Sequence, residues 1–298
     1  MNKQDRFTGC LLGLACGDAV GTTVEFKPRG SFEPVTDMIG GGYFDLKAGQ
    51  WTDDTSMALC IADSLVKMGC FDARDIMDRF CLWRSTGYRS STGKCFDIGG
   101  VTAQALAKYY KDGNPYAGSS KPNTAGNGCL MRLAPVPMFH CYDGAGQIMK
   151  YSILSSKLTH NAKECLEAIS FFSEMLWMAL GGCPKQMMLN TMKSMDYGSK
   201  GITSIAAQEY RDKSRDEIKG SGHVVESLEA ALWCFDKTDS FKDAVLMAVN
   251  LGDDADTTGA IVGQLAGAFY GVGAIPKGWL KKLHLRKEIE ALAIKLMR

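Results

Sequence analysis

The sequence predicts a mostly helical protein that folds as one compact domain over residues 1–298. Three observations support this fold class. Apolar residues recur at intervals of three and four through most of the chain, which is typical of helices with one buried face. Alternation of apolar and polar residues never persists beyond a few positions, so strands are not expected. No repeat and no Pro- or Ser-rich linker divides the sequence.

The composition is ordinary for a soluble globular protein. Apolar residues make up 46% of the 298 residues, a length that suits one large domain or two small ones. A formal net charge of +1 gives no general attraction to nucleic acid or to anionic membranes. No apolar run is long enough to span a bilayer. The eleven cysteines form no C-x-x-C pair and no signal peptide is visible, so we expect reduced, mostly buried thiols in a cytoplasmic protein.

The first helix is expected around the apolar residues between Phe7 and Ala15, which recur at helical spacing. Gly9, Gly13 and Gly17 stand at every fourth position, on one face of such a helix. The run is too short for a membrane, so this spacing predicts close packing against another helix. Asp18 ends the stretch among small residues.

A long irregular loop is predicted over residues 27–50, after Glu25, because it contains Pro28 and the run Gly40-Gly41-Gly42. The three glycines do not form a phosphate loop, since no Gly-Lys-Ser or Gly-Lys-Thr follows them. Loops of this length inside a compact domain are often functional, and we expect a lid here. Without further information Glu25 is simply a loop carboxylate.

The middle of the chain alternates predicted helices with short polar loops. The periodicity predicts helices over residues 72–84, 103–110, 144–158, 161–180 and 239–250, and loops over 85–94 and 112–122. Two polar residues stand at helix boundaries, Asp97 and His160. Each has an ordinary explanation as a helix cap or a surface residue.

A small-residue turn, Gly126-Asn127-Gly128-Cys129, precedes an apolar segment. Backbone N–H groups at such a turn can bind a phosphate. Residues 184–196 form a Met-rich amphipathic segment that we interpret as core filling. Polar loops and a short helix are expected over 197–221, and a strong helix opens at 220–226 and continues through 235. The basic, amphipathic end over 280–298 is expected to be one surface helix docked by its Leu and Ile face.

Two acidic clusters carry the chemistry. Gly252-Asp253-Asp254-Ala255-Asp256-Thr257-Thr258-Gly259 precedes a small, apolar helix, and Trp51-Thr52-Asp53-Asp54-Thr55 precedes a second helix that runs to residue 68. One Asp at a helix start is an ordinary cap, but several crowded carboxylates repel one another unless a cation neutralises them. If the two helix starts meet, their hard oxygen ligands suit Mg²⁺, Mn²⁺ or Ca²⁺ rather than Zn²⁺, and two ions can share the site. For either cluster alone, solvated caps are an equally good explanation, whereas both clusters together favour metal.

These motifs, taken in this order, resemble the ADP-ribosylglycohydrolase family, and in particular its bacterial ADP-ribosyl-dinitrogen-reductase hydrolase branch. The resemblance extends from about residue 6 to residue 270, and it rests on Gly17-Asp18-Ala19-Val20-Gly21, Thr52-Asp53-Asp54, Gly126-Asn127-Gly128-Cys129-Leu130-Met131-Arg132 and Gly252-Asp253-Asp254-Ala255-Asp256-Thr257. It implies a compact all-α bundle with a binuclear metal site in a central cleft. The implied activity is metal-dependent removal of ADP-ribose from a modified protein, with ADP-ribosyl-arginine as the main substrate.

The resemblance also implies roles for particular residues. Asp97 is the acid/base candidate, with Glu25 as the other candidate, and the sequence does not decide between them. The implied ligands of two divalent cations, Mg²⁺ or Mn²⁺, are Thr52, Asp53, Asp54, Asp254, Asp256 and Thr257. The implied contacts to ADP-ribose are Gly100, Thr102, Asn127, Gly128, Cys129, Met131, His160, Ser221, Gly222 and His223. Many family members have Ser where this chain has Cys129, and an aromatic or small residue at the position of His223.

Alternative functions remain open from the sequence. The same fold can act on another linkage of ADP-ribose, to serine, to an acyl group or to a nucleobase. It can also bind ADP-ribosylated targets, or block an ADP-ribosylating toxin, with little turnover. An EF-hand-like Ca²⁺ protein is disfavoured by the spacing of the acids, and the sequence has no Gly-x-Ser-x-Gly motif for a serine nucleophile. We expect an ADP-ribosylated protein as the partner, no nucleic acid or membrane partner, and a monomer.

Overall fold

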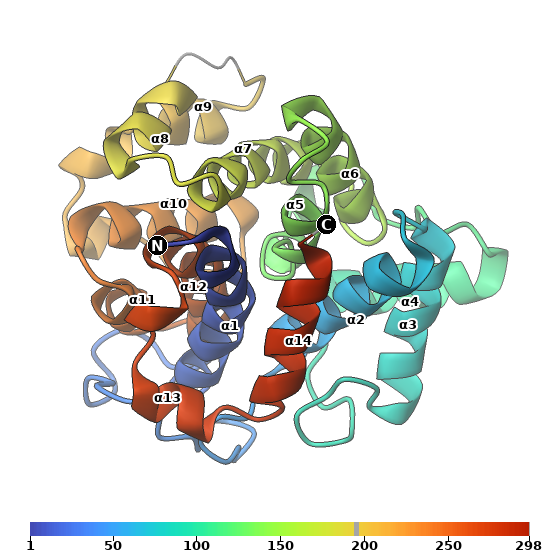
Figure 1. Cartoon of the computed structure of the whole chain (residues 1–298), viewed down its shortest axis with the longest axis horizontal. Coiled ribbons are helices and arrows are strands. Elements are labelled where there is room, and N and C mark those ends of the chain that lie inside the picture. The colour runs from blue at the N-terminus through green and yellow to red at the C-terminus, as the bar shows by residue number, and fades with distance from the viewer. Residues whose placement is uncertain (194–196, 298) are drawn as a thin grey trace.

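The computed structural model describes residues 1–193 and 197–297, and within these ranges it is all-helical (Figure 1). The only β-type pairings there are isolated bridges, such as the one between Gly41 and Leu46. The α-helices are α1 (Lys3–Gly21), α2 (Asp53–Met68), α3 (Ala73–Thr86), α4 (Gly100–Asp112), α5 (Pro135–Phe139), α6 (Ala145–Lys157), α7 (Lys163–Leu180), α8 (Lys185–Met192), α9 (Lys200–Ala206), α10 (Val224–Lys237), α11 (Phe241–Val249), α12 (Ala255–Tyr270), α13 (Lys277–Lys282) and α14 (Arg286–Leu296). The predicted all-α fold is therefore confirmed.

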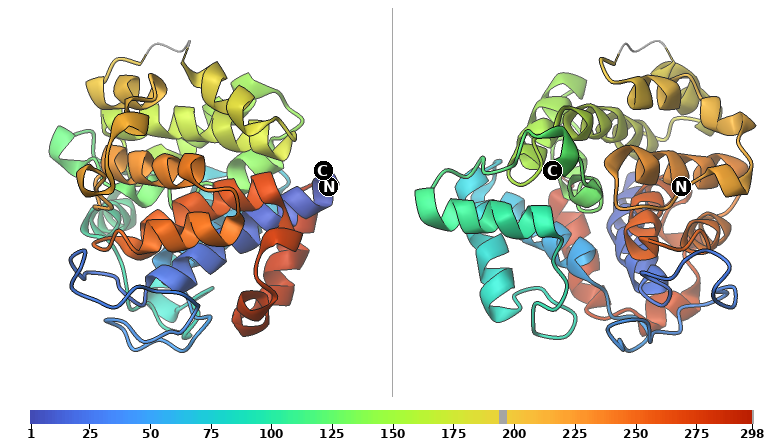
Figure 2. Two further views of the ribbon diagram at one scale, coloured as in Figure 1. Left: turned by 90° about the vertical axis from the view of Figure 1, so that its left-hand side faces the viewer. Right: turned by 180° about the vertical axis from the view of Figure 1, so that it is seen from behind.

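The centre of the molecule is the pair α1 and α12, which run alongside each other in both figures (Figures 1 and 2). Glycines line the contact on both helices. A Cβ atom on Gly13 would lie 2.2 Å from the carbonyl oxygen of Gly263, and one on Gly17 would lie 2.0 Å from that of Gly259. Only glycine permits so close an approach of two backbones. The close helix packing predicted from the glycine spacing is confirmed.

The remaining helices surround this pair. The α10 and α11 helices contact α12 on one side, and α14 joins α1 to α2 on the other (Figure 1). The α3 and α4 helices lie further out, beyond α2. The buried apolar residues of these elements form a contiguous core cluster. Its continuity agrees with the one-domain organisation, which stays a prediction.

The segment between α1 and α2 is irregular, as expected, and runs along one end of the bundle (blue loops at the lower edge of Figure 2). The structure gives all eleven cysteines as unpaired thiols, of which Cys70 alone is exposed. In the Met-rich segment, Met188 and Met192 of α8 are buried, in line with core filling, and residues 194–196 lie outside the described residues. None of the described helices combines the length and the apolar character that crossing a membrane requires.

The carboxyl-terminal segment differs from the prediction. One helix was expected over residues 280–298, but the chain forms α13 and α14 with a break at 283–285. Leu285 has a φ of +46°, a left-handed conformation that cannot continue an α-helix. The expected docking of the apolar face is confirmed, because Ile289 and Leu296 of α14 are buried in the core.

Candidate active site

The starts of α2 and α12 meet in space and bring the two acidic clusters together. Thr52 precedes α2, and its Oγ1 lies 3.0 Å from Oδ2 of Asp256 in the first turn of α12 and 3.3 Å from Oδ2 of Asp54. Five of the six residues implied as metal ligands are buried, with 8% exposure or less, and the sixth, Asp254, is half-buried. Chain segments some 200 positions apart thus share one oxygen-rich site.

Helix capping does not explain these residues. Thr52 and Asp254 occupy the N-cap positions of α2 and α12, yet neither side chain accepts a capping hydrogen bond from its helix. Among the described residues, one oxygen each of Glu25, Asp54 and Asp256 is buried without a hydrogen-bond partner. An unpartnered buried carboxylate oxygen is costly unless a cation contacts it.

The raised pKa values of the buried acids also favour a bound cation at this site. Burial and the neighbouring carboxylates raise the pKa of Asp53, Asp54 and Asp256 well above the usual range. Burial, with Asp97 as the next cause, raises the pKa of Glu25 to about 10. Carboxylate oxygens of Glu25, Asp97 and Asp256 lie within 4.8 Å of one another. Oxygen-only ligands at this density fit a hard divalent cation, which would restore the charged form of each acid.

Asp18 belongs to one of the motifs that carry the family resemblance, but no role was predicted for it, and the structure places it in the site. It lies in the last turns of α1 and is fully buried. Its carboxylate accepts hydrogen bonds from N and Oγ1 of Thr52, at 2.9 and 3.0 Å, and from N and Oγ1 of Thr55, at 3.0 and 2.6 Å. Asp18 therefore supplies the cap of α2 from another helix, and it fixes the orientation of Thr52.

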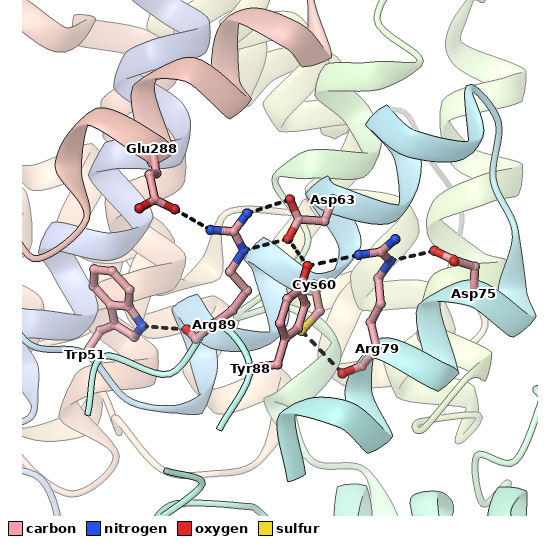
Figure 3. Close-up of polar contacts among 8 residues, drawn as sticks. All are labelled: Trp51, Cys60, Asp63, Asp75, Arg79, Tyr88, Arg89 and Glu288. Carbon is pink, nitrogen blue, oxygen red and sulfur yellow. Dashed lines mark hydrogen bonds and ion pairs between the residues drawn. The ribbon is translucent and has the colours of Figure 1, made fainter. Parts of the chain in front are cut away.

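A second network holds the backbone just before Thr52 (Figure 3). The indole of the buried Trp51 donates to the carbonyl of Arg89 at 3.4 Å, and Oγ of Ser91 donates to the carbonyl of Trp51 at 2.6 Å. The guanidinium of Arg89 donates to both oxygens of Asp63, at 2.6 and 2.8 Å, and to Glu288 at 2.6 Å (Figure 3). The bidentate pair joins the 89–91 loop to α2, and the bond to Glu288 joins it to α14, so the segment that holds Trp51 is itself tied to two helices.

A cavity of about 660 Å³ opens above the acids. Most residues predicted for the site lie on its wall. These are Glu25, Asp53, Asp97, Gly100, Thr102, Asn127, Gly128, Met131, His160, Ser221, Gly222, Asp254, Asp256 and Thr257. Thr52 and Asp54 are not on the wall and are buried among the other acids.

Cys129 and His223 are not among the residues that line the cavity. Cys129 is buried, and its thiol lies 4.0 Å from the carbonyl oxygen of Gly126. His223 is the N-cap of α10, where its Nδ1 accepts from the Val225 N–H at 3.3 Å and its Nε2 lies 3.4 Å from Glu164. Both side chains therefore lie off the cavity wall, and their contact with the substrate stays a prediction.

The small-residue turn at 126–129 is fixed against the acidic site. Nδ2 of Asn127 donates to Oδ2 of Asp254 at 2.7 Å, and the Asn127 N–H donates to the carbonyl of Gly222 at 3.1 Å. Below the turn, Gln264 of α12 donates to the carbonyl of Leu130 and accepts from the N–H of Ala134, both at 2.9 Å. Gln264 was missed from the sequence, although a polar side chain within the apolar run of α12 was a signal.

His160 lies on the cavity wall and is held from below by Arg132. Nη2 of the buried Arg132 donates to Oγ1 of Thr159 at 2.5 Å, and that hydroxyl lies 2.7 Å from Nδ1 of His160. Burial, together with the charge of Arg132, lowers the pKa of His160 to about 3, so the ring is neutral. A Cβ atom on Gly128 would lie 2.8 Å from the ring, which explains the glycine in the turn.

Comparison with models of known protein families shows to which family the chain belongs. A family model described as ADP-ribosylglycohydrolase matches residues 1–298. The chain belongs to the ADP-ribosylglycohydrolase family. The resemblance stated from the motifs is thereby confirmed.

Individual members of the ADP-ribosylglycohydrolase family are similar over nearly the whole chain. The ADP-ribosylarginine hydrolase Tri1 of Pseudomonas putida is 45% identical over 98% of this chain and 78% of its own length. The ADP-ribosyl-[dinitrogen reductase] glycohydrolase of Rhodospirillum rubrum is 34% identical over 96% of this chain and 93% of its own. A solved structure described as an ADP-ribosylglycohydrolase-related protein complex covers 99% of this chain and 98% of its own, with 43% identity and a TM-score of 0.88.

Proposed function

We propose that this protein hydrolyses the N-glycosidic bond between ADP-ribose and an arginine side chain of a modified protein. The observation that carries the proposal is the set of buried, unpartnered carboxylate oxygens at the base of a cavity of about 660 Å³. Two relatives at 43–45% identity, from Pseudomonas putida and Serratia proteamaculans, bear the name ADP-ribosylarginine hydrolase. Their similarity supports arginine over the other linkages.

The residues that would hold divalent cations are Thr52, Asp53, Asp54, Asp254, Asp256 and Thr257. We propose two ions, Mg²⁺ or Mn²⁺, because both metals prefer oxygen ligands and the number of carboxylates exceeds what one ion needs. When bound, such ions supply Lewis-acid stabilisation of charge and a template for the ribose hydroxyls and water. Asp18 and the network around Trp51 hold the ligand-bearing start of α2 in place before the substrate arrives.

The proton transfer is assigned to Asp97. This residue lies ahead of α4 on the cavity wall and is half-buried, so it faces the space that the substrate would occupy. Glu25 also lies on the wall but is 3% exposed. Burial raises the pKa of Asp97 to about 6, against a hydrogen bond from Asp53 that lowers it. A carboxyl that titrates near neutral pH can both accept and return a proton during glycoside hydrolysis.

The other side of the cavity is proposed to bind the ADP moiety. The turn at 126–128 lies on this wall, and Ser221 and Gly222 lie beside it through the hydrogen bond from the Asn127 N–H to the Gly222 carbonyl. The neutral ring of His160 adds no charge to that wall. An uncharged, backbone-rich surface of this kind suits a pyrophosphate whose charge is balanced elsewhere.

The reaction is tested with a panel of linkages. The protein is incubated, in buffer containing Mg²⁺, with arginine-ADP-ribosylated protein, serine-ADP-ribosylated protein and O-acetyl-ADP-ribose, and free ADP-ribose is quantified. We expect release from the arginine conjugate at a rate far above the other two. Preferential release from another substrate would overturn the arginine assignment, and tight binding of ADP-ribose without release from any of them would indicate a binding protein.

A further inference from the structure

An aromatic surface adjoins the cavity through Phe26, which lies on the cavity wall, and the proposed reaction assigns it no role. It is formed by Phe26, Tyr43, Phe44 and Phe96, which we call the aromatic rim. The ring centroids of Phe26 and Tyr43 are 5.3 Å apart, those of Tyr43 and Phe44 5.0 Å, and those of Phe44 and Phe96 5.1 Å, all with edge-to-face geometry. The rim therefore links the irregular loop after α1 to the loop before α4.

Two of the four rings in the aromatic rim are exposed to solvent, whereas Phe44 and Phe96 are half-buried. Tyr43 is 73% exposed and Phe26 57%. The neighbouring Ile39 is 61% exposed. Large apolar side chains that cluster on the surface of a protein commonly mark a site of interaction.

The backbone holds these rings outward. Gly41 and Leu46 exchange two hydrogen bonds, at 2.6 and 2.9 Å, so Tyr43 and Phe44 stand at the tip of a closed loop. That loop is pressed onto the end of α1, because a Cβ atom on Gly42 would lie 2.0 Å from the carbonyl oxygen of Thr22. The tip is thus a fixed feature of the surface, supported on glycines that approach another backbone closely.

Phe26 is held in a conformation that bulky residues rarely adopt. Its φ is +61°, and its N–H donates to the carbonyl of Asp253 at 2.8 Å, while the Asp253 N–H donates to the carbonyl of Lys27 at 2.8 Å. A non-glycine residue in the left-handed region is strained, and such strain collects at functional sites. Here the strained residue is on the cavity wall and in the aromatic rim at once.

The position of the aromatic rim indicates which part of the substrate it can contact. Phe26 directly follows Glu25, and Phe96 directly precedes Asp97, the acid to which proton transfer at the scissile bond is assigned. On the far side of that bond from the ribose, the substrate continues as a guanidinium, an aliphatic stem and a polypeptide. Guanidinium groups stack on the faces of aromatic rings, and exposed clusters of apolar side chains commonly bind other polypeptide segments.

Resting on the proposed function, we propose that the aromatic rim is the docking surface for the polypeptide segment that carries the ADP-ribosylated arginine. Phe26, next to the cavity, contacts the arginine side chain. Tyr43, at the exposed tip, contacts residues that flank the arginine. The rim makes the enzyme favour a modified protein over free ADP-ribosyl-arginine.

The test separates protein substrate from small substrate. Steady-state kinetics are measured with arginine-ADP-ribosylated protein and with free ADP-ribosyl-L-arginine for the wild type and Tyr43→Ala. We expect Tyr43→Ala to raise KM for the protein substrate about tenfold, equivalent to about 1.4 kcal/mol, with kcat little changed. KM and kcat for the small substrate stay close to wild type. Tyr43→Phe, which keeps the ring, should restore the wild-type KM for the protein.

The matched control is Tyr110→Ala, since Tyr110 is 88% exposed on α4 and outside the rim. Tyr110→Ala should leave KM and kcat unchanged for both substrates. An unchanged KM for the protein substrate in Tyr43→Ala would overturn the docking surface. An equal loss on both substrates would also overturn it, because the ring would then serve the nucleotide or the fold. A wild-type enzyme that is inactive on both substrates would instead refute the proposed function, and the docking surface with it.

Discussion

At the scale of the residue, the site is defined by carboxylates that are buried, whereas most carboxylates lie on the surface in contact with water. Asp54 and Asp256 are buried, and each keeps an oxygen without a partner among the described residues. The composition of the two clusters predicted this site, because crowded acids at two helix starts are hard to explain without a cation. The residues that support the ligands were not predictable in the same way. Asp18 contacts Thr52, which is 34 positions away in the sequence, and Arg132 contacts Thr159, which is 27 positions away. A single sequence does not reveal such contacts.

The first prediction separates Asp97 from Glu25. Asp97→Asn should retain ADP-ribose affinity and lose turnover by about 10²- to 10⁴-fold, because the amide preserves shape but cannot carry the proton. ADP-ribose affinity is measured by titration calorimetry and turnover by ADP-ribose release. Asp216→Asn, at an exposed acid that does not line the cavity, serves as the control. An active Asp97→Asn together with an inactive Glu25→Gln would reverse the two roles.

At the scale of the element, the helices were predictable where periodicity was strong, and less so where tertiary contacts set their ends. The glycine spacing of α1 correctly indicated a helix partner, but it could not name α12 as that partner. The break at Leu285 escaped prediction because the residues on both sides keep a helical pattern. The strained backbone of Phe26 escaped as well, since it depends on hydrogen bonds to Asp253.

The second prediction tests the α1–α12 contact. Gly13→Ala should destabilise the protein by about 3 kcal/mol or more, because its Cβ would lie 2.2 Å from the backbone oxygen of Gly263. A backbone atom cannot relieve this clash by changing a side-chain rotamer. The loss is measured as the free energy of unfolding in urea. Gly146→Ala is the matched control on α6, where a Cβ meets nothing within 4 Å. That change should be neutral or slightly stabilising. Equal effects at both glycines would contradict the packing described.

At the scale of the whole molecule, the fold places a repulsive cluster at the contact of its central helices. Three elements, α1, α2 and α12, bring Asp18, Asp54 and Asp256 together in the core. Without a cation, the burial of these acids opposes folding. A cation that binds only the folded state therefore adds its binding free energy to stability.

The third prediction concerns pH. The pKa of Asp18 and of Asp97 is raised from 3.8 to about 6, mainly by burial. The folded state then binds more protons than the unfolded state, so the stability these groups contribute is present below their unfolded pKa and is lost as pH rises through about 6. A divalent cation at the neighbouring carboxylates would favour the charged form of both acids. The gain in unfolding free energy from Mg²⁺, relative to chelator, should therefore be larger at about pH 7 than at about pH 5. A gain that does not change over this range would contradict the account.

The most direct test of the central claim, that the buried carboxylates hold a cation used for hydrolysis, is release of ADP-ribose from an arginine-ADP-ribosylated protein with Mg²⁺, with Mn²⁺ and with chelator. We predict release with either metal, none with chelator, and none from Asp256→Ala, a variant that should remain folded by circular dichroism and bind metal more weakly. Full activity of Asp256→Ala, or equal release in chelator, would contradict the claim.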